Sequence, residues 1–390
     1  MKKIYFAGII LFLFSVPSYS QSIRTGAERT EVYFRWLKNK NVAVVANQTS
    51  LIQKTHLVDS LLNAGIKVKK IFCPEHGFRG EAQEGEKVNN SKDKRTGLPL
   101  ISLYGKHKKP SSDDLEDIDA VVFDLQDVGT RFYTYTSTMS YVMEACAENK
   151  ITFIVLDRPN PNGFYVDGPV METAFVSFVG LFPVPIVHGL TVAEYALMIN
   201  GEKWLKTKHR LKLKVVGMEN YNHSIRYSLP VMPSPNLPNA NAVFLYPSLC
   251  LFEGTVVSVG RGTDKPFQIF GHPDYPEHDF SFTPHQKPGS SIIPSFNKKT
   301  CYGIDLTIYA ENHRYTEGKL NLEWLLLMYK KLPDAKNFFN DYFDTLAGNH
   351  TLQQQIKEGL SEEKIRESWQ QDLNKYKKIR KKYLLYPDFE

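Results

Sequence analysis

The sequence contains few of the residues that build covalent or metal-held scaffolds. Only four of its 390 residues are cysteines, and no two of them are spaced as a C-x-x-C pair. This spacing excludes a zinc-finger type of site, and a disulfide framework is not expected in a chain of this size. We therefore predict four buried free thiols, at Cys73, Cys146, Cys250 and Cys301.

Long apolar runs are absent beyond the first residues. Residues 4–14 form a short apolar stretch behind Lys2 and Lys3, and residues 18–20 supply the small side chains of a cleavage site. The stretch is about half of the ~20 residues that a membrane span requires. We predict that residues 1–20 are a signal peptide, that the protein is exported to the periplasm or the extracellular space, and that it is not stably inserted in a membrane after cleavage.

A strong excess of one charge is also missing. The formal net charge is +6, which is too small over this length to indicate a nucleic-acid partner. It is compatible with an anionic small ligand or a negatively charged wall polymer.

The standard cofactor and nucleophile motifs do not occur. No G-x-G-x-x-G follows the first predicted strand, no P-loop ends in Lys-Ser/Thr, and no G-x-S-x-G or H-E-x-x-H is present. A dinucleotide cofactor is therefore disfavoured, and we expect neither a cofactor nor a bound metal. The site has to be built from carboxylates, histidines, amides and arginines.

Strand-like and helix-like segments alternate over the first two thirds of the chain. Residues 42–46 are a valine-rich apolar run, typical of a strand that is buried on both faces of a parallel sheet. A helix follows, for which Thr55 is the expected N-cap and Gly65 the stop, and Thr191 with Glu194 forms a capping box for a later helix. The further expected strands are 66–72, 100–103, 119–125 and 151–156, and the further helices are 135–149 and 191–200. This alternation predicts an α/β fold with an open, doubly wound sheet.

Four prolines between residues 230 and 238 interrupt this pattern. Their density indicates a linker or an extended loop. Short segments rich in Gly and Pro follow to about residue 300, and residues 321–382 are expected to be mostly helical, with the charged stretch 362–382 as a solvated helix face. We place a domain boundary at residue 238, so that the two domains span residues 21–238 and 239–390.

Four of the five predicted strands end in polar turns. These turns comprise residues 47–50, 74–81, 124–131 and 157–163. Ligands of open α/β sheets bind beyond the carboxyl ends of the strands, where such loops converge. One polar turn alone is more often an ordinary solvated turn, but four at the same edge predict a functional cleft.

The side chains in these turns suit glycosyl transfer. That reaction needs an acid to protonate the leaving oxygen and a second group to stabilise or capture an oxocarbenium-like centre. Glu75 is the candidate acid, because it follows a buried apolar strand and because Pro74 and Gly77 would fix its approach. The alternative is that Glu75 caps its own turn or pairs with Arg79.

Further candidates surround Glu75 in the sequence. His76 is expected to position groups, with roles as a second proton carrier or a metal ligand left open, and Glu81 is an alternative carboxylate. Asp124 and Asp127 bracket Gln126 after the central strand. One of these two carboxylates could orient an arginine and the other a sugar hydroxyl.

Seven motifs stand in a fixed order along the chain: Val45-Ala46-Asn47-Gln48-Thr49, Pro74-Glu75-His76-Gly77-Phe78-Arg79-Gly80, residues 123–135, Leu156-Asp157-Arg158-Pro159-Asn160-Pro161, Pro233-Ser234-Pro235-Asn236, residues 252–255 and residues 260–263. Together they resemble the DUF1343 family, which is associated with exo-lytic β-N-acetylmuramidases. The resemblance covers nearly the whole chain after residue 20. It implies a Rossmann-like first domain with a mostly parallel sheet, and a smaller C-terminal α+β domain that closes the cleft.

The resemblance also implies a substrate. The enzyme would release N-acetylmuramic acid from the non-reducing ends of peptidoglycan fragments, which makes peptidoglycan-derived saccharides its partners. The lactyl carboxylate of that sugar needs a cation, for which Arg131 and Arg261 are candidates. Tyr133 and Tyr135 could stack on the sugar or belong to the core. The other binding candidates are Asn47, Arg79, Asp124, Gln126, Asp157, Arg158, Asn160, His188, Asn236 and Glu253.

Two other functions remain open from the sequence. A metal-dependent hydrolase of wall peptides or esters could use Glu75, His76, Asp127 and His188. A non-catalytic wall-binding protein could use the same cleft and release nothing. For a glycosidase, retention, inversion and assistance by the substrate's 2-acetamido group also remain open, because the sequence gives no distance between carboxylates.

Overall fold

The structure is a computed structural model that describes residues 22–75, 77–79, 91–287 and 293–390. The expected signal peptide at residues 1–20 lies outside the described residues. None of the described helices is long and apolar enough to cross a membrane. The four cysteines are buried free thiols, as predicted.

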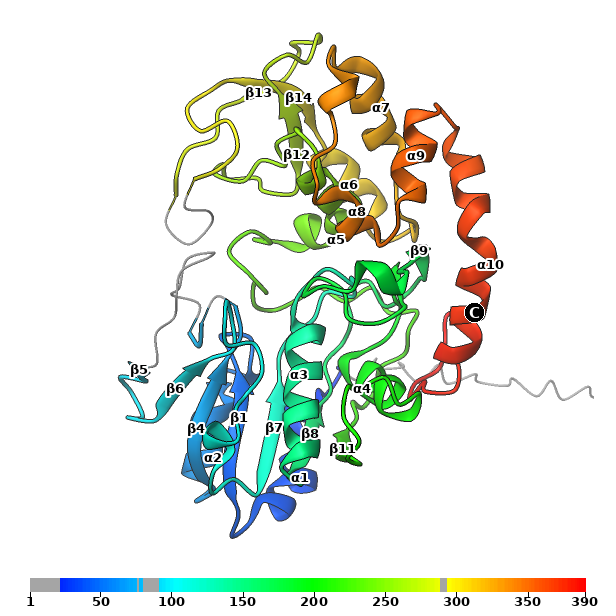
Figure 1. Cartoon of the computed structure of the whole chain (residues 1–390). Coiled ribbons are helices and arrows are strands. Elements are labelled where there is room, and N and C mark those ends of the chain that lie inside the picture. Colours follow the sequence, from blue (N-terminus) through cyan, green and yellow to red (C-terminus); the bar gives the residue numbers. More distant parts are fainter. Residues whose placement is uncertain (1–21, 76, 80–90, 288–292) are drawn as a thin grey trace, which may run out of the picture.

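A seven-stranded sheet organises the first half of the chain (Figure 1). Its strands are β1 (Asn41–Ala46), β4 (Lys67–Cys73), β5 (Ser91–Lys92), β6 (Pro99–Ser102), β7 (Ala120–Asp124), β8 (Thr152–Leu156) and β11 (Lys212–Val216). The strand order is β11-β8-β7-β1-β4-β6-β5, and every pair except β5 with β6 is parallel. The predicted α/β fold with a mostly parallel sheet is confirmed.

Both faces of the sheet are covered by helices, because its strands are apolar on both sides. The helices are α1 (Thr30–Leu37), α2 (Leu57–Asn63), α3 (Tyr135–Glu148) and α4 (Val192–Gly201). Ala43 and Val45 of β1 join one hydrophobic core with α3 and α4, whereas Val42 and Val44 join the other with α1 and α2. Successive residues of a strand point to opposite faces, which explains the continuous apolar run of β1.

Two local predictions in this part need correction. The N-cap of α2 is His56, whose ring accepts a hydrogen bond from the N–H of Val58, and Thr55 lies instead in the short strand β3 (Thr55–His56), which pairs with β2 (Leu51–Ile52). Strand β11 was not predicted. It is an edge strand with exposed lysines, so it lacks the apolar run that marks the inner strands.

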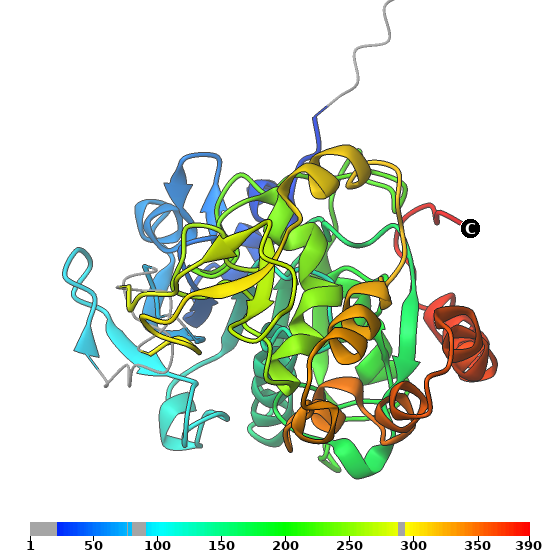
Figure 2. The same cartoon turned by 90° about the horizontal axis from the view of Figure 1, so that it is seen from above.

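The remainder of the chain forms a smaller antiparallel sheet with several helices. The strands are β12 (Ile269–His272), β13 (Ser281–Phe282) and β14 (Cys301–Asp305), in the order β12-β14-β13. The helices are α5 (Ala240–Leu249), α6 (Thr307–His313), α7 (Glu323–Lys331), α8 (Phe343–Ala347), α9 (Thr351–Lys357) and α10 (Glu362–Arg380). Seen from above, these later segments overlie the large sheet (Figure 2). The predicted boundary at residue 238 stays a prediction.

Helix α5 was missed because it contains a proline. Pro247 has no N–H to donate to the carbonyl of Val243, four residues earlier. The side chain of Asn162 donates to that carbonyl instead, at 3.1 Å. A contact from another part of the chain therefore makes the proline tolerable in the last turn.

Helix α10 is more than the solvated face that its charges suggest. It runs along one side of the molecule and packs against β9 (Asp167–Val170), which pairs with β10 (Pro185–Val187) (Figure 1). Its buried stripe includes Ile365, Trp369 and Tyr376. Only the opposite face of α10 is solvated. Through its buried face the helix joins the two parts of the chain, which are the part that forms the large sheet and the later part that forms the antiparallel sheet and its helices.

Candidate active site

The turn after β4 presents Glu75 at the carboxyl edge of the sheet. The N–H of Gly77 donates to the carbonyl of Pro74 at 3.1 Å, which closes the turn around Glu75. Gly77 has a φ of 77°, a conformation that glycine adopts without steric cost. The hydroxyl of Thr134, which precedes α3, donates to Oε2 of Glu75 at 3.1 Å. The turn therefore fixes the backbone at Glu75, and Thr134 holds its carboxyl group.

Glu75 lines a cleft of about 440 Å³ between the two parts of the chain. The loop after β7, the proline-rich loop at residues 230–238 and the segment after α5 all contribute to its lining. The predicted site residues that the fold brings together here are Glu75, Tyr133, Tyr135, Asn236, Glu253 and Arg261.

Two buried tyrosines form the inner wall of the cleft. The rings of Tyr133 and Tyr135 lie 4.7 Å apart, and the hydroxyl of Tyr133 donates to the carbonyl of Pro233 at 3.0 Å. Burial raises the pKa of both phenols above its ordinary value, so both remain protonated at neutral pH.

Asn47 supports this wall from below. It is fully buried, its Nδ2 donates to the hydroxyl of Tyr135 at 2.9 Å, and its Oδ1 accepts from the N–H and hydroxyl of Thr49. The structure therefore corrects the expectation that Asn47 contacts a ligand. It positions Tyr135, which lines the cleft.

An ion pair forms another part of the cleft lining. Nε of Arg261 lies 2.6 Å from Oε1 of Glu253, and the two side chains are 20% and 24% exposed. The guanidinium also lies 5.1 Å from the ring centroid of Phe267. Among the described residues that line the cleft, Arg261 is the only cation. This wall can therefore bind an anionic group with an oriented guanidinium.

Arg131 is not available to a ligand, which corrects one of the two predicted carboxylate partners. Its side chain is 1% exposed and donates to four backbone carbonyls. Nη1 binds Pro169 and Val184 at 3.1 and 2.8 Å, and Nη2 binds Leu346 and Ala347 at 2.7 and 2.8 Å. The first two carbonyls lie around β9 and β10 and the last two end α8. Arg131 thus clamps the two parts of the chain together.

Asp124 and Arg158 form a buried pair beneath the loops. Arg158 Nε and Nη2 donate to the two carboxylate oxygens of Asp124 at 2.6 and 2.9 Å. The side chains are 0% and 6% exposed. Nη2 of Arg158 also donates to the carbonyl of Leu51 at 3.0 Å. The expected contact of either residue with substrate is therefore corrected, because both are buried and neither lines the cleft.

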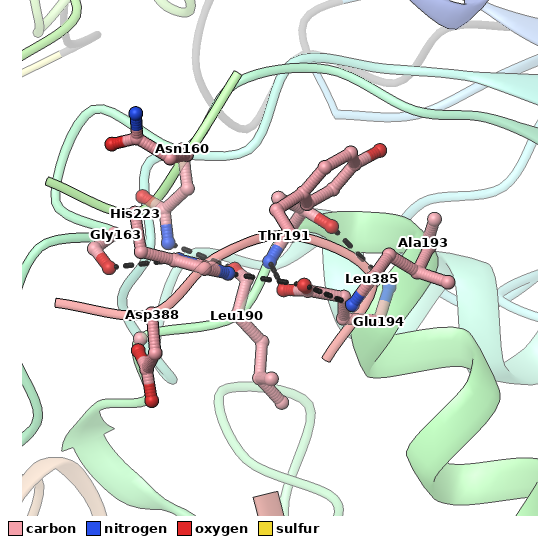
Figure 3. A network of polar contacts seen from close by, with 12 residues as sticks. Asn160, Gly163, Leu190, Thr191, Ala193, Glu194, His223, Leu385 and Asp388 are labelled. Carbon is pink, nitrogen blue, oxygen red and sulfur yellow. Dashed lines mark hydrogen bonds and ion pairs between the residues drawn. The ribbon is translucent and has the colours of Figure 1, made fainter. Parts of the chain in front are cut away.

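Asp157 and Asn160 are likewise occupied by the fold. Asp157 accepts from the hydroxyls of Thr191 and Tyr386 at 2.8 and 2.6 Å. Asn160 donates to the carbonyl of Leu190 at 2.8 Å (Figure 3). Burial, with the nearby Glu194 carboxylate, raises the pKa of Asp157 to about 7. Neither residue lines the cleft, so their predicted binding roles are corrected to structural ones.

A second buried polar pair ties down the end of the chain. The ring nitrogens of His223 face the carbonyl of Gly163 and the carboxylate of Glu194, each at 3.0 Å (Figure 3). The same Glu194 oxygen accepts from the N–H of Leu385 at 2.8 Å. These contacts hold the segment after α10 against α4.

Asp127 and His188 lie together below the cleft. Their side chains are 4% and 1% exposed, and His188 Nε2 is 3.5 Å from Asp127 Oδ2. Gln126 is buried beside them and donates to the carbonyls of Asp127 and Pro159. Asp127 therefore does not reach the cleft as a catalytic carboxylate, and Gln126 and His188 do not reach it as ligands. Within the described ranges no group of three or more His, Cys, Asp or Glu side chains could hold a metal.

The remaining predicted residues fall into two groups. Arg79 forms a two-pronged pair with Asp93 at 2.9 Å, and this pair holds the pKa of Asp93 near 2. Arg79 does not line the cleft, and the binding role predicted for it stays a prediction. His76 and Glu81 lie outside the described residues.

Sequence reasoning missed six aromatic residues that line the cleft: Tyr104, Phe132, Phe178, Tyr246, Phe267 and Tyr342. Tyr104 follows the end of β6, so the rule that ligands bind beyond strand ends would have found it. Phe178 and Tyr342 carry no such signal, because only the tertiary fold brings them to this edge of the sheet.

Comparison with protein families gives two matches. Residues 42–241 match the family described as exo-β-N-acetylmuramidase NamZ, N-terminal, and residues 244–386 match its C-terminal counterpart. The chain is also 39% identical over 374 residues to the peptidoglycan β-N-acetylmuramidase NamZ of Bacillus subtilis strain 168, covering 91% of this chain and 89% of that protein.

Solved structures give the same result. One DUF1343 family protein of Bacteroides fragilis has a TM-score of 0.87 and 43% identity, covering 94% of this chain and all of that one. A second protein of the same family and organism has a TM-score of 0.76 and 29% identity, covering 93% of this chain and 99% of the other.

Proposed function

Because this chain belongs to the exo-β-N-acetylmuramidase NamZ family, we propose that it is a glycosidase that releases N-acetylmuramic acid from the non-reducing ends of peptidoglycan fragments. The observation that carries the proposal is the position of Glu75. Its carboxyl group lines the cleft between the two parts of the chain, where its own turn fixes the backbone and Thr134 holds the carboxyl group.

We assign Glu75 the role of general acid. The hydroxyl of Thr134 donates to Oε2, which leaves Oε1 as the oxygen that carries the proton to the leaving group. A positioned acid of this kind contributes roughly 10²- to 10⁴-fold to the rate. Thr134 thus sets which carboxyl oxygen faces the glycosidic bond.

Arg261 is the proposed partner of the lactyl carboxylate. It lines the same cleft as Glu75, and Glu253 holds its Nε edge. A guanidinium fixed in this way binds a carboxylate with directional, charge-assisted hydrogen bonds. Glu253 is then the second carboxylate of the site, placed to orient a sugar hydroxyl or the 2-acetamido group.

The test uses a chromogenic β-N-acetylmuramide. The wild-type protein should release the chromophore, and Glu75→Gln should lose roughly 10²- to 10⁴-fold in kcat while keeping its Tm. Glu116→Gln is the matched control, because Glu116 is exposed just before β7, at the amino edge of the sheet. Absence of release by the wild type would leave a wall-binding role in place of catalysis, and full activity of Glu75→Gln would remove Glu75 from the mechanism.

Export to the periplasm or the extracellular space is part of the same proposal. The apolar stretch at residues 4–14, behind two lysines, supports it. Cells that express the full chain would be fractionated, and the N-terminus of the product would be sequenced. The protein should be found outside the cytoplasmic fraction and should begin near residue 21. Recovery of the uncleaved chain from the cytoplasm would contradict export.

A further inference from the structure

Three aromatic side chains stand at the outer part of the cleft that contains Glu75. They are Tyr104, Phe178 and Tyr342. Tyr342 is 41% exposed, and Tyr104 and Phe178 are each partly buried. The rings of Tyr104 and Phe178 lie 6.3 Å apart, so they form one continuous aromatic surface.

The inner end of the same cleft is closed. Tyr133, Tyr246 and Phe267 line it with exposed fractions of only 7%, 8% and 1%. Tyr246 packs edge to face against both other rings, with centroids 6.0 and 4.9 Å away. The cleft is therefore blocked at its floor by packed aromatic side chains and open toward solvent at its rim.

This asymmetry decides which sugar each end can hold. An enzyme that removes one terminal sugar must place that sugar at the closed end, since the rest of the chain has to leave through the open end. Arg261, which lies against Phe267, belongs to the closed end and suits the sugar that bears the carboxylate. The exposed aromatic rim is left to face the leaving part of the substrate.

The rim is built from segments that the fold fixes in place. Phe178 sits in a turn whose flanking residues, Ser177 and Gly180, exchange backbone hydrogen bonds of 2.9 and 3.1 Å. Tyr141 stacks against Phe178, with ring centroids 6.2 Å apart, and Nζ of Lys108 lies over the Phe178 ring, 4.5 Å from its centroid. Tyr342 is the N-cap of α8, the helix whose last carbonyls bind Arg131. The rim is therefore held in place before any ligand arrives.

The position of Tyr342 relates the rim to the reacting atoms. Burial of its phenol and the nearby acidic groups of Cys250, Glu253 and Glu75 raise the pKa of Tyr342. Tyr342, Glu75 and Glu253 all line this cleft. A sugar that lies against Tyr342 therefore shares the cleft with both glutamates.

We propose that Tyr104, Phe178 and Tyr342 form a binding subsite for the leaving sugar, an N-acetylhexosamine joined to the terminal N-acetylmuramic acid. A pyranose ring has one face of C–H groups, which packs against an aromatic ring while its hydroxyls stay in water. This subsite rests on the proposed glycosidase function and explains how a fragment would be preferred over a simple glycoside.

The experiment compares two substrates that differ only in the leaving group. Methyl β-N-acetylmuramide has no leaving sugar ring, whereas the disaccharide N-acetylmuramyl-β-1,4-N-acetylglucosamine has one. We expect Tyr342→Ala and Tyr104→Ala each to lower kcat/KM about tenfold for the disaccharide, mainly through KM, and to change the methyl glycoside less than twofold. Tyr342→Phe should keep the preference for the disaccharide, because it keeps the ring.

Tyr315→Ala is the matched control, because Tyr315 is 51% exposed and lies outside this cleft. It should change neither substrate. Equal losses on both substrates, or no loss on the disaccharide, would overturn the subsite while the glycosidase function stands. A wild-type protein that cleaves neither substrate would overturn the glycosidase function and the subsite with it.

Discussion

Replacing Arg131 by methionine should destabilise the protein rather than weaken substrate binding directly. Methionine fills a similar volume but cannot donate to the carbonyls of Pro169, Val184, Leu346 and Ala347, which Arg131 binds at 2.7 to 3.1 Å. Gly348, just after α8, has a φ of 79°, and a Cβ there would come within 2.8 Å of the guanidinium. The chain is thus shaped around the arginine.

The size of the effect follows from the number of acceptors. Each lost hydrogen bond costs about 1 kcal/mol net, because the cost of burying the cation offsets part of the charge-assisted gain. Four bonds give about 4 kcal/mol. At about 2 cal/mol/K per residue, this corresponds to a Tm about 5 °C lower for a chain of this length.

Calorimetry and steady-state kinetics measured side by side test this reasoning. Arg261→Met is the comparison, because its ion pair with Glu253 is partly exposed and stabilises by less than about 1 kcal/mol. That variant should keep its Tm and lose affinity for N-acetylmuramides. The reasoning is refuted if Arg131→Met unfolds at the wild-type temperature and raises KM as Arg261→Met does.

Three further predictions test other parts of the structure. Arg158→Leu leaves the buried carboxylate of Asp124 without its partner and should lower the free energy of unfolding, measured in urea, by about 3–5 kcal/mol. Most of this loss should be recovered in the double variant Asp124→Leu, Arg158→Leu. An unchanged urea midpoint for Arg158→Leu would contradict the pairing. Because the pKa of Asp157 is raised to about 7 in the folded state, its contribution to stability is complete below pH ~4 and is lost as pH rises to about 7. The Tm of Asp157→Asn relative to the wild type should therefore rise between these two pH values and stay constant above them, which thermal unfolding at a series of pH values would measure. Thr134→Val removes the hydroxyl that holds Glu75 and should lower kcat about tenfold with little change in KM; a change confined to KM would place Thr134 in binding instead.

Much of the first half of the fold could be predicted because its signals are local. The valine-rich run of β1 and the capping box of α4, formed by Thr191 and Glu194, depend on neighbours in the sequence. The turn around Glu75 also followed from Pro74 and Gly77. Parallel strands place their following loops at one edge, so the position of a cleft was predictable as well.

The C-terminal half was harder to predict because distant contacts decide its structure. Pro247 argues against helix α5 until Asn162 supplies a donor to the carbonyl of Val243. The charges of α10 indicate a solvated helix, but β9 covers its other face, where Ile365 and Trp369 are buried. In both places a partner that is remote in the sequence outweighs the local preference.

The sequence alone determined that polar loops gather at the carboxyl edge of a parallel sheet and that Glu75 is among them. Only the tertiary structure decided which of those polar groups meet solvent in the cleft. Asp124 is buried because Arg158 reaches it, and Arg131 is buried because carbonyls from both parts of the chain surround it. A charged side chain can be buried only where partners compensate for its lost hydration, and those partners come from segments that the fold alone brings together.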